Sequence, residues 1–188
     1  MDFQPLPLAG AFLIRLQAHA DHRGFFARTF CVDEFAAAGL PAQFPQQNLA
    51  RSERAGTLRG MHLQLAPHAE DKLVRCVRGR IFDAIVDLRD DSPTYRRSCA
   101  VTLDDRGGDA LFVPAGFAHG YQTLVDDTDV LYAMSSRYAP AAARSIRYND
   151  PALRIDWPLP APILSDTDRD APGLEALLAE LTARRGAT

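Results

Sequence analysis

The stretch KLVRCVRGRIFDAIVDL, residues 72–88, decides the fold class of this chain. Lys72–Val77 and Ile81–Leu88 are short runs rich in branched apolar residues, which is typical of β-strands. Arg78-Gly79-Arg80 lies between them and has the composition of a hairpin turn, since glycine adopts backbone angles that other residues avoid. The stretch predicts a β-hairpin, and the rest of the chain repeats its pattern.

Eight further short apolar runs predict strands, with loop-forming residues between them. They are Phe12–Leu16, Phe25–Phe30, Gln46–Ala50, Leu58–Gln64, Ala100–Leu103, Ala110–Val113, His119–Thr123 and Val130–Ser135. Two segments have helical character: Asp33–Ala38, which ends at Gly39, and Gly173–Arg185, which carries four leucines on one face. No linker, repeat or low-complexity tract interrupts the sequence. We therefore expect a single all-β domain, residues 1–188, built as a sandwich or barrel with short peripheral helices and a C-terminal helix.

The composition excludes several classes of protein. The chain has 188 residues, a net charge of −3 and no apolar run long enough to cross a membrane, so we expect neither a nucleic-acid-binding nor a membrane protein. Three scattered cysteines suggest neither a disulfide framework nor a metal knuckle. The first residues do not have the pattern of a signal peptide. We expect a cytoplasmic protein.

One predicted strand carries carboxylates where apolar residues are expected. By alternation, Ile81, Asp83, Ile85 and Asp87 share one face. Two carboxylates do not suit a dry core, so this face is either exposed to solvent or turned into a polar cavity. A solvent-exposed face is the default expectation.

Four titratable residues could perform chemistry together. His62 lies inside an apolar strand, Lys72 begins the next one, Tyr132 lies in another, and Asp168 closes LSDTD, residues 164–168. Each alone has an ordinary structural interpretation, such as a core aromatic or a helix cap. Lys72 stands out because the other 20 basic residues are all arginine, and a lysine is a compact point charge.

The four residue types complement one another as an epimerase. A neutral histidine can remove a proton next to a carbonyl group, and a carboxylate behind it fixes the imidazole tautomer. A cation stabilises the enolate oxygen, and a tyrosine opposite the base can return a proton to the other face. Sequence spacing does not show that these four residues converge.

Several motifs in the same order resemble the dTDP-4-dehydrorhamnose 3,5-epimerase family of cupins, from about Asp21 to Pro172. The matching stretches are Asp21–Phe26, Gln46–Asn48, Gly56–Gln64, Lys72–Cys76, Asp83–Arg89 with Ser92–Thr94, Pro114–Gly120, Asp150-Pro151, Ile155–Pro158 and Leu164–Asp168. The resemblance implies a cupin-type double-stranded β-helix, or jelly roll, that acts as a homodimer on a nucleotide-diphosphate 4-keto sugar. It implies no metal and no organic cofactor.

The resemblance also implies a role for each site residue. His62 corresponds to the base, Asp168 to the residue that orients it, Lys72 to the cation at the enolate oxygen and Tyr132 to the acid. Residues that correspond to substrate-binding positions are Arg23, Gln46, Asn48, Arg59, His119 and Tyr138. The expected reaction converts dTDP-4-dehydro-6-deoxy-D-glucose to dTDP-4-dehydro-L-rhamnose by inversion at C3 and C5.

Four positions depart from the family pattern. Arg28 replaces a residue that is usually acidic, and this reversal of charge leaves the exact nucleotide and sugar open. Leu63, Ser98 and Ala133 replace a common aromatic residue, tryptophan and lysine, respectively.

The arrangement of one strand poses a geometric problem. Strict alternation would send Arg59 and His62 to opposite faces, and Gly60 between them suggests a β-bulge that brings both into one cavity.

Three other functions remain open at this stage. The same residues could support epimerisation at C3 or C5 only, or a ketoisomerisation, on a related sugar nucleotide. A metal-dependent cupin would need a histidine cluster, and the five histidines contain no HxH pair. A non-catalytic module that binds the same ligand is the third alternative.

Overall fold

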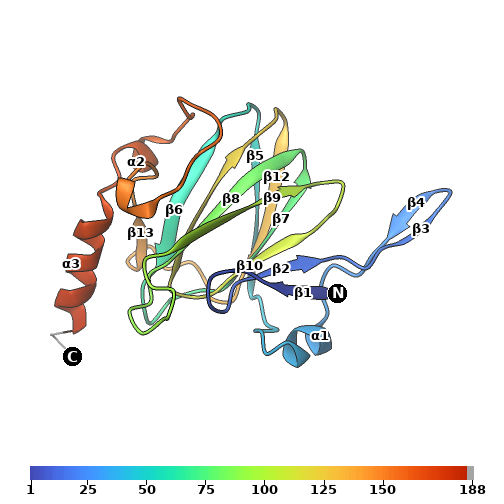
Figure 1. The fold of residues 1–188 in the computed structure, drawn as a ribbon, viewed down its shortest axis with the longest axis horizontal. Helices are drawn as coiled ribbons and strands as arrows, with labels where there is room; N and C mark the ends of the chain where they lie inside the picture. Colours follow the sequence, from blue (N-terminus) through green and yellow to red (C-terminus); the bar gives the residue numbers. More distant parts are fainter. Residues whose placement is uncertain (186–188) are drawn as a thin grey trace.

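Two antiparallel β-sheets face each other and form the body of the molecule in the computed structural model (Figure 1). The structure describes residues 1–185, so residues 186–188 of the predicted domain lie outside the described part. The larger sheet contains, in spatial order, β1 (Asp2–Pro5), β2 (Phe12–Arg15), β10 (Ala110–Val113), β7 (Lys72–Arg78), β12 (Thr128–Met134) and β5 (Gln46–Ser52). The smaller sheet contains β13 (Ala143–Ser145), β6 (Leu58–Gln64), β11 (Phe117–Thr123), β8 (Arg80–Asp87) and β9 (Ser98–Asp104). This double-sheet jelly roll confirms the predicted fold class, and its two sheets do not join into a closed barrel.

Apolar side chains from both sheets fill the space between them. The core includes Val74 and Cys76 of β7, and Ile81 and Ile85 of β8. Asp83 lies on the same face of β8 as these isoleucines and has no exposed surface.

The expectation that the carboxylates of β8 face solvent is therefore wrong. Asp83 and Asp87 are both fully buried inside the sandwich. Asp87 tolerates burial because it accepts hydrogen bonds from Arg89, Ser92 and Thr94. Asp83 pairs through Oδ1 with His119, while its Oδ2 has no hydrogen-bond partner among the described residues.

The first and the last helix pack against the outer faces of the sheets. The helix α3 (Leu174–Arg185), the 3-10 turn η1 (Pro151–Leu153) and the short helix α2 (Asp166–Arg169) follow the last strand. Leu174 and Leu177 of α3 are buried against Met61 and Leu63 of β6, which confirms the predicted leucine face. The helix α1 (Val32–Ala37) places Phe35 against β2 and β10 of the larger sheet.

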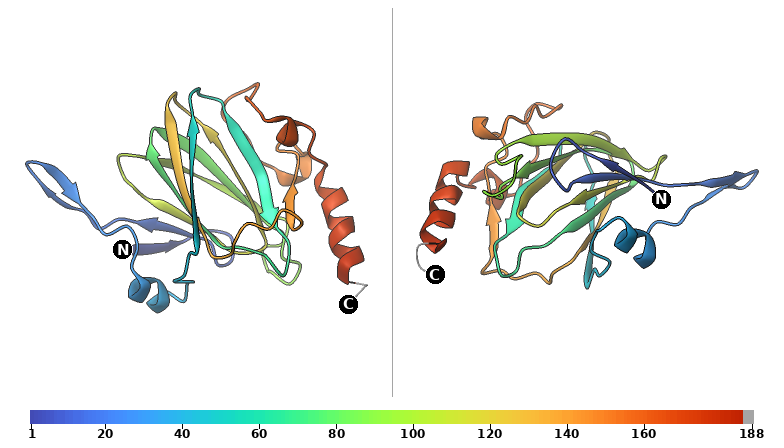
Figure 2. Two further views of the ribbon diagram at one scale, coloured as in Figure 1. Left: turned by 180° about the vertical axis from the view of Figure 1, so that it is seen from behind. Right: turned by 60° about the horizontal axis from the view of Figure 1, so that its bottom comes forward.

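A two-stranded hairpin projects from the body of the molecule (Figure 2). It consists of β3 (His19–Asp21) and β4 (Gly24–Phe26), and we call it the β3–β4 arm. The prediction of a strand over Phe25–Phe30 is correct only as far as Phe26. Phe25 and Phe26 are 53% and 75% exposed, so the arm presents aromatic surface that the described part of this chain does not cover.

A β-bulge at Gly60 solves the geometric problem of β6. His62 pairs with His119 of β11, and Arg59 pairs with Tyr121, so three steps along β6 match two steps along β11. Gly60 has φ +125°, a conformation that favours glycine. Arg59 and His62 consequently line the same cavity, which confirms the bulge hypothesis.

Gly60→Ala tests how strictly the bulge depends on glycine. A Cβ atom at this position would lie 2.5 Å from the Gly120 Cα and 2.8 Å from the His119 carbonyl oxygen. We expect the free energy of unfolding, measured by urea denaturation, to fall by about 3 kcal/mol or more, because overpacking and backbone strain both destabilise the folded state. Gly107→Ala is the control, since the nearest atom to its Cβ would be 3.7 Å away. A loss in Gly60→Ala no larger than in this control would contradict the packing argument.

Candidate active site

Two adjoining cavities lie between the sheets and the segment that contains α2. The first has a volume of about 450 Å³ and is lined by Thr57, Leu58, Arg59, His62, Lys72, His119, Tyr121, Tyr132, Ile163, Leu164, Ser165, Thr167 and Asp168. The second has a volume of about 320 Å³ and shares four of these residues, His62, Lys72, Tyr132 and Thr167. The four predicted catalytic residues thus line one cavity, although up to 106 positions separate them in the sequence.

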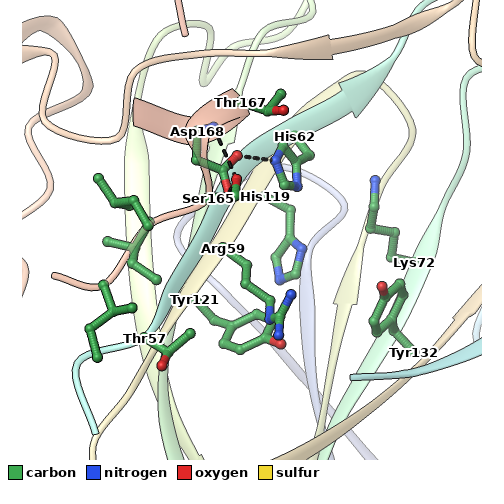
Figure 3. Close-up of a pocket in the computed structure, with 13 residues that line it drawn as sticks. Thr57, Arg59, His62, Lys72, His119, Tyr121, Tyr132, Ser165, Thr167 and Asp168 are labelled. Carbon is green, nitrogen blue, oxygen red and sulfur yellow. Dashed lines mark hydrogen bonds and ion pairs between the residues drawn. The ribbon is translucent and has the colours of Figure 1, made fainter. Parts of the chain in front are cut away.

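His62 and Asp168 form the central pair of this site. His62 Nε2 lies 2.6 Å from Asp168 Oδ1. The His62 side chain is 45% exposed, whereas that of Asp168 is 6% exposed, so the carboxylate lies behind the ring (Figure 3). When Nε2–H donates to Asp168, the neutral imidazole has its unprotonated nitrogen at Nδ1. The site therefore has a base whose tautomer is set by a buried carboxylate.

Asp168 is held as a carboxylate by its surroundings. Burial, the largest single effect, raises the pKa of Asp168, but the hydrogen bond and charge of His62, together with the hydrogen bonds described next, outweigh it, and the pKa falls below its usual value. Ser165 Oγ donates to Asp168 Oδ2 at 2.9 Å, and the Gly60 N–H contributes in the same direction. Ser165 is also the N-cap of α2, where its Oγ accepts from the Asp168 N–H. The bulge and the helix cap therefore both fix this carboxylate.

His119 and Asp83 form a second pair of the same kind. His119 Nε2 lies 2.6 Å from Asp83 Oδ1, and both side chains are buried. Sequence reasoning predicted His119 as a substrate-binding residue but did not connect it with Asp83. The signal was present, since an aspartate alternating with isoleucines on β8 fits a polar cavity.

Lys72 and Tyr132 lie together, across the cavity from Asp168 (Figure 3). They come from neighbouring strands, β7 and β12, where Tyr132 pairs with Val74 and Met134 with Lys72. The Lys72 ammonium donates to Glu70, which sequence reasoning missed because Glu70 lies in a loop without any motif of its own.

The predicted binding residues divide into three groups. Arg59 and His119 line the first cavity, and Gln46, Asn48 and Tyr138 line the second. Gln46 Oε1 accepts from the Tyr138 N–H at 2.9 Å, which ties β5 to the loop after β12.

Arg23 is the exception among the predicted binding residues. It lies at the turn of the β3–β4 arm, where it is exposed and pairs with Asp21 at 2.7 Å. It lines neither of the two cavities. The structure of a single chain therefore does not bring Arg23 to the site.

The residues that depart from the family pattern lie outside the first cavity. Arg28 lies between the arm and α1, where it pairs with Glu34 at 2.9 Å. Leu63 is buried and lines only the second cavity, while Ser98 and Ala133 line neither.

Within residues 1–185, no group of three histidine, cysteine or acidic side chains is placed to hold a metal ion. None of the described helices is long and apolar enough to span a membrane.

The arrangement suits proton transfer next to a carbonyl group. One wall of the cavity provides a histidine backed by a carboxylate, and another provides a lysine and a tyrosine. A carbonyl oxygen near Lys72 would gain negative charge as a neighbouring carbon loses its proton to His62.

Comparisons with known proteins agree with this chemistry. The family model described as dTDP-4-dehydrorhamnose 3,5-epimerase matches residues 5–176. The dTDP-4-dehydrorhamnose 3,5-epimerase of Sinorhizobium fredii is 41% identical over 175 residues, which cover 93% of this chain and 90% of the relative. A dTDP-4-dehydrorhamnose 3-epimerase of Streptomyces niveus is 40% identical over 172 residues, covering 91% of this chain and 83% of that protein.

A solved structure shows the same fold. It is the dTDP-6-deoxy-D-glucose-3,5-epimerase of Legionella pneumophila Philadelphia 1, in complex with dTDP-4-keto-L-rhamnose. It matches with a TM-score of 0.89 and 35% sequence identity over 96% of each chain. This chain therefore belongs to the dTDP-4-dehydrorhamnose 3,5-epimerase family.

Proposed function

We propose that this protein is an isomerase that inverts C3 and C5 of dTDP-4-dehydro-6-deoxy-D-glucose and produces dTDP-4-dehydro-L-rhamnose. The observation that carries the proposal is the 2.6 Å pair of His62 and Asp168 in the same cavity as Lys72 and Tyr132. The names of the relatives and the ligand of the Legionella pneumophila structure support this choice of substrate. The whole chain acts as one epimerase domain in this proposal.

Each step of the reaction has a residue suited to it. His62 Nδ1 takes the proton from the carbon next to the C4 carbonyl, and the electron pair moves to the carbonyl oxygen to give an enolate. Lys72 donates a hydrogen bond to that oxygen and stabilises its charge. Tyr132 then donates a proton to the opposite face of the same carbon, which inverts it. Loss of the proton from His62 to water and return of a proton from water to the Tyr132 phenolate restore the starting state, so the same sequence can follow at the second carbon without a metal or an organic cofactor.

Epimerisation at C3 alone is the second candidate function. The 40% identical relative from Streptomyces niveus is a 3-epimerase, so a chain this similar can act at one carbon. The two reactions share the base and the enolate-stabilising cation, and they differ in whether C5 also exchanges its proton. A measurement that resolves the two carbons therefore decides between them.

An NMR time course in D2O tests the function. Purified protein is incubated with dTDP-4-dehydro-6-deoxy-D-glucose, and deuterium at C3 and C5 is followed separately. We expect deuterium at both carbons and a product with the L-rhamno configuration. Exchange at C3 alone would assign the protein as a 3-epimerase, and no exchange by folded protein would contradict the proposal.

Two variants assign the roles in the same assay. His62→Ala should lower exchange at both carbons by about 10²- to 10⁴-fold, because it removes the base. His68→Ala is its matched control, since His68 lies on an exposed loop. Tyr132→Phe should allow exchange but prevent inversion, and inversion at the wild-type rate would remove Tyr132 from the acid role.

We also propose that the protein is a homodimer in which the β3–β4 arm of one protomer reaches the cavity of the other. Arg23 corresponds to a substrate-binding position, yet it lies on a projecting arm away from the cavities of its own chain. The exposed Phe25 and Phe26 on the arm, and Leu49 and Val77 on the larger sheet, offer apolar surface for such a contact.

The free cysteines Cys31, Cys76 and Cys99 suit a reducing compartment, which supports a cytoplasmic location.

Co-expression of two inactive variants tests the dimer. Arg23→Ala and His62→Ala chains should combine into a mixed dimer that has one site with both residues intact. Random pairing would restore about a quarter of wild-type activity. Sedimentation of the wild type as a monomer, or a co-expressed mixture as inactive as its parents, would contradict the shared site.

A further inference from the structure

The ammonium group of Lys72 is paired with a buried carboxylate behind it. Lys72 Nζ lies 2.5 Å from Glu70 Oε1, and the two side chains are only 9% and 6% exposed. An isolated buried charge is strongly unfavourable, whereas a paired and hydrogen-bonded one is tolerated. An ammonium group has three donors, so this contact leaves two for other partners.

Glu70 is itself fixed by Gln64. The Gln64 amide nitrogen donates to the second oxygen of Glu70 and also to the His68 carbonyl oxygen at 3.1 Å. The Gln64 amide oxygen is occupied by the Ala139 N–H at 2.6 Å, so the side chain cannot reverse without losing that bond. Two donors, from Lys72 and Gln64, therefore face the two oxygens of Glu70. A glutamine at position 70 would turn its NH2 group toward one of these two donors, which cannot accept a hydrogen bond from it.

The same arrangement occurs three times around the first cavity. His62 is paired with Asp168, His119 with Asp83, and Lys72 with Glu70. In each pair the carboxylate side chain is at most 6% exposed, while its partner lines the cavity. Asp168 fixes the orientation of His62, and the equivalent placement of Glu70 indicates that it orients Lys72 in the same way.

We infer that Glu70 is a positioning residue that directs the ammonium group of Lys72 toward the C4 oxygen of the substrate. This inference rests on the proposed function for the identity of that oxygen. The other titratable or charged side chains that line the first cavity with Lys72 are Arg59, His62, His119, Tyr121, Tyr132 and Asp168, and the second cavity adds Glu70, Tyr138 and Arg144. Within residues 1–185, Glu70 is the residue that hydrogen-bonds to the Lys72 ammonium.

Lys72 is the single lysine of the chain, so its side chain can be observed without overlap. Protein labelled with ¹³C only in lysine gives one side-chain Cε resonance, whose chemical shift follows the surroundings of the ammonium group. We expect this resonance to move in Glu70→Gln at constant pH, and kcat to fall at least about tenfold with little change in KM, because the hydrogen bond that holds the ammonium group is gone. Glu175→Gln removes an exposed carboxylate 73% accessible to solvent and should change neither quantity.

Glu70→Asp separates position from charge. It keeps the anion but shortens its reach, so kcat should fall at least about tenfold with little change in KM. This variant also carries the test if Glu70→Gln does not fold. Wild-type kcat in Glu70→Asp, or a wild-type Lys72 resonance in folded Glu70→Gln, would overturn the inference. The NMR measurement needs no substrate, so it decides the role of Glu70 even if the D2O assay contradicts the proposed reaction.

Discussion

The hydrogen bond between His62 and Asp168 is the interaction on which the rest of the site depends. It joins the middle of β6 to a short helix 106 residues later, and it forms only if several local structures are in place. The bulge at Gly60 turns His62 and Arg59 into one cavity. The Ser165 cap holds Asp168, and the packing of Leu174 and Leu177 on β6 keeps the C-terminal segment against the smaller sheet. The fold therefore positions both of the residues that this bond joins.

Buried carboxylates are the feature that distinguishes the interior of this jelly roll from an ordinary core. Asp83, Asp168 and Glu70 each lie behind a basic side chain of the cavity. Removing a carboxylate from water is unfavourable, and a partner at hydrogen-bond distance offsets that penalty only in good geometry. Such pairs are therefore weak evidence for stability, and their grouping around one cavity is better explained by function. They hold basic groups in fixed orientations, which lowers the reorganisation needed during proton transfer.

Much of the fold could be predicted from the sequence because its signals are local. Alternating apolar runs and glycine turns identified most strands of the two sheets, and a leucine face identified α3. The short strands β1, β3 and β13 were not predicted, since three or four residues carry too little periodicity. The strand expected over residues 25–30 stops at Phe26 because pairing depends on a neighbouring strand, which sequence propensity does not reveal.

The site was predictable only in part, because sequence motifs identify residues but not the contacts between distant segments. The motifs identified His62, Lys72, Tyr132 and Asp168, and the structure brings all four to one cavity. Asp83 and Glu70 were missed as partners because side-chain pairing between strands and loops leaves no fixed spacing in the sequence. The place of Arg23 was also not predictable, since a hairpin that leaves the body of its own chain has no distinct sequence pattern.

A crystal structure of the protein with dTDP-D-glucose, which lacks the 4-keto group and does not react, tests the central claim most directly. The account predicts that the hexose ring lies between His62 and Tyr132, on opposite faces, with its C4 oxygen toward Lys72. A hexose bound outside the first cavity, or with His62 and Tyr132 on the same face of the ring, would contradict it.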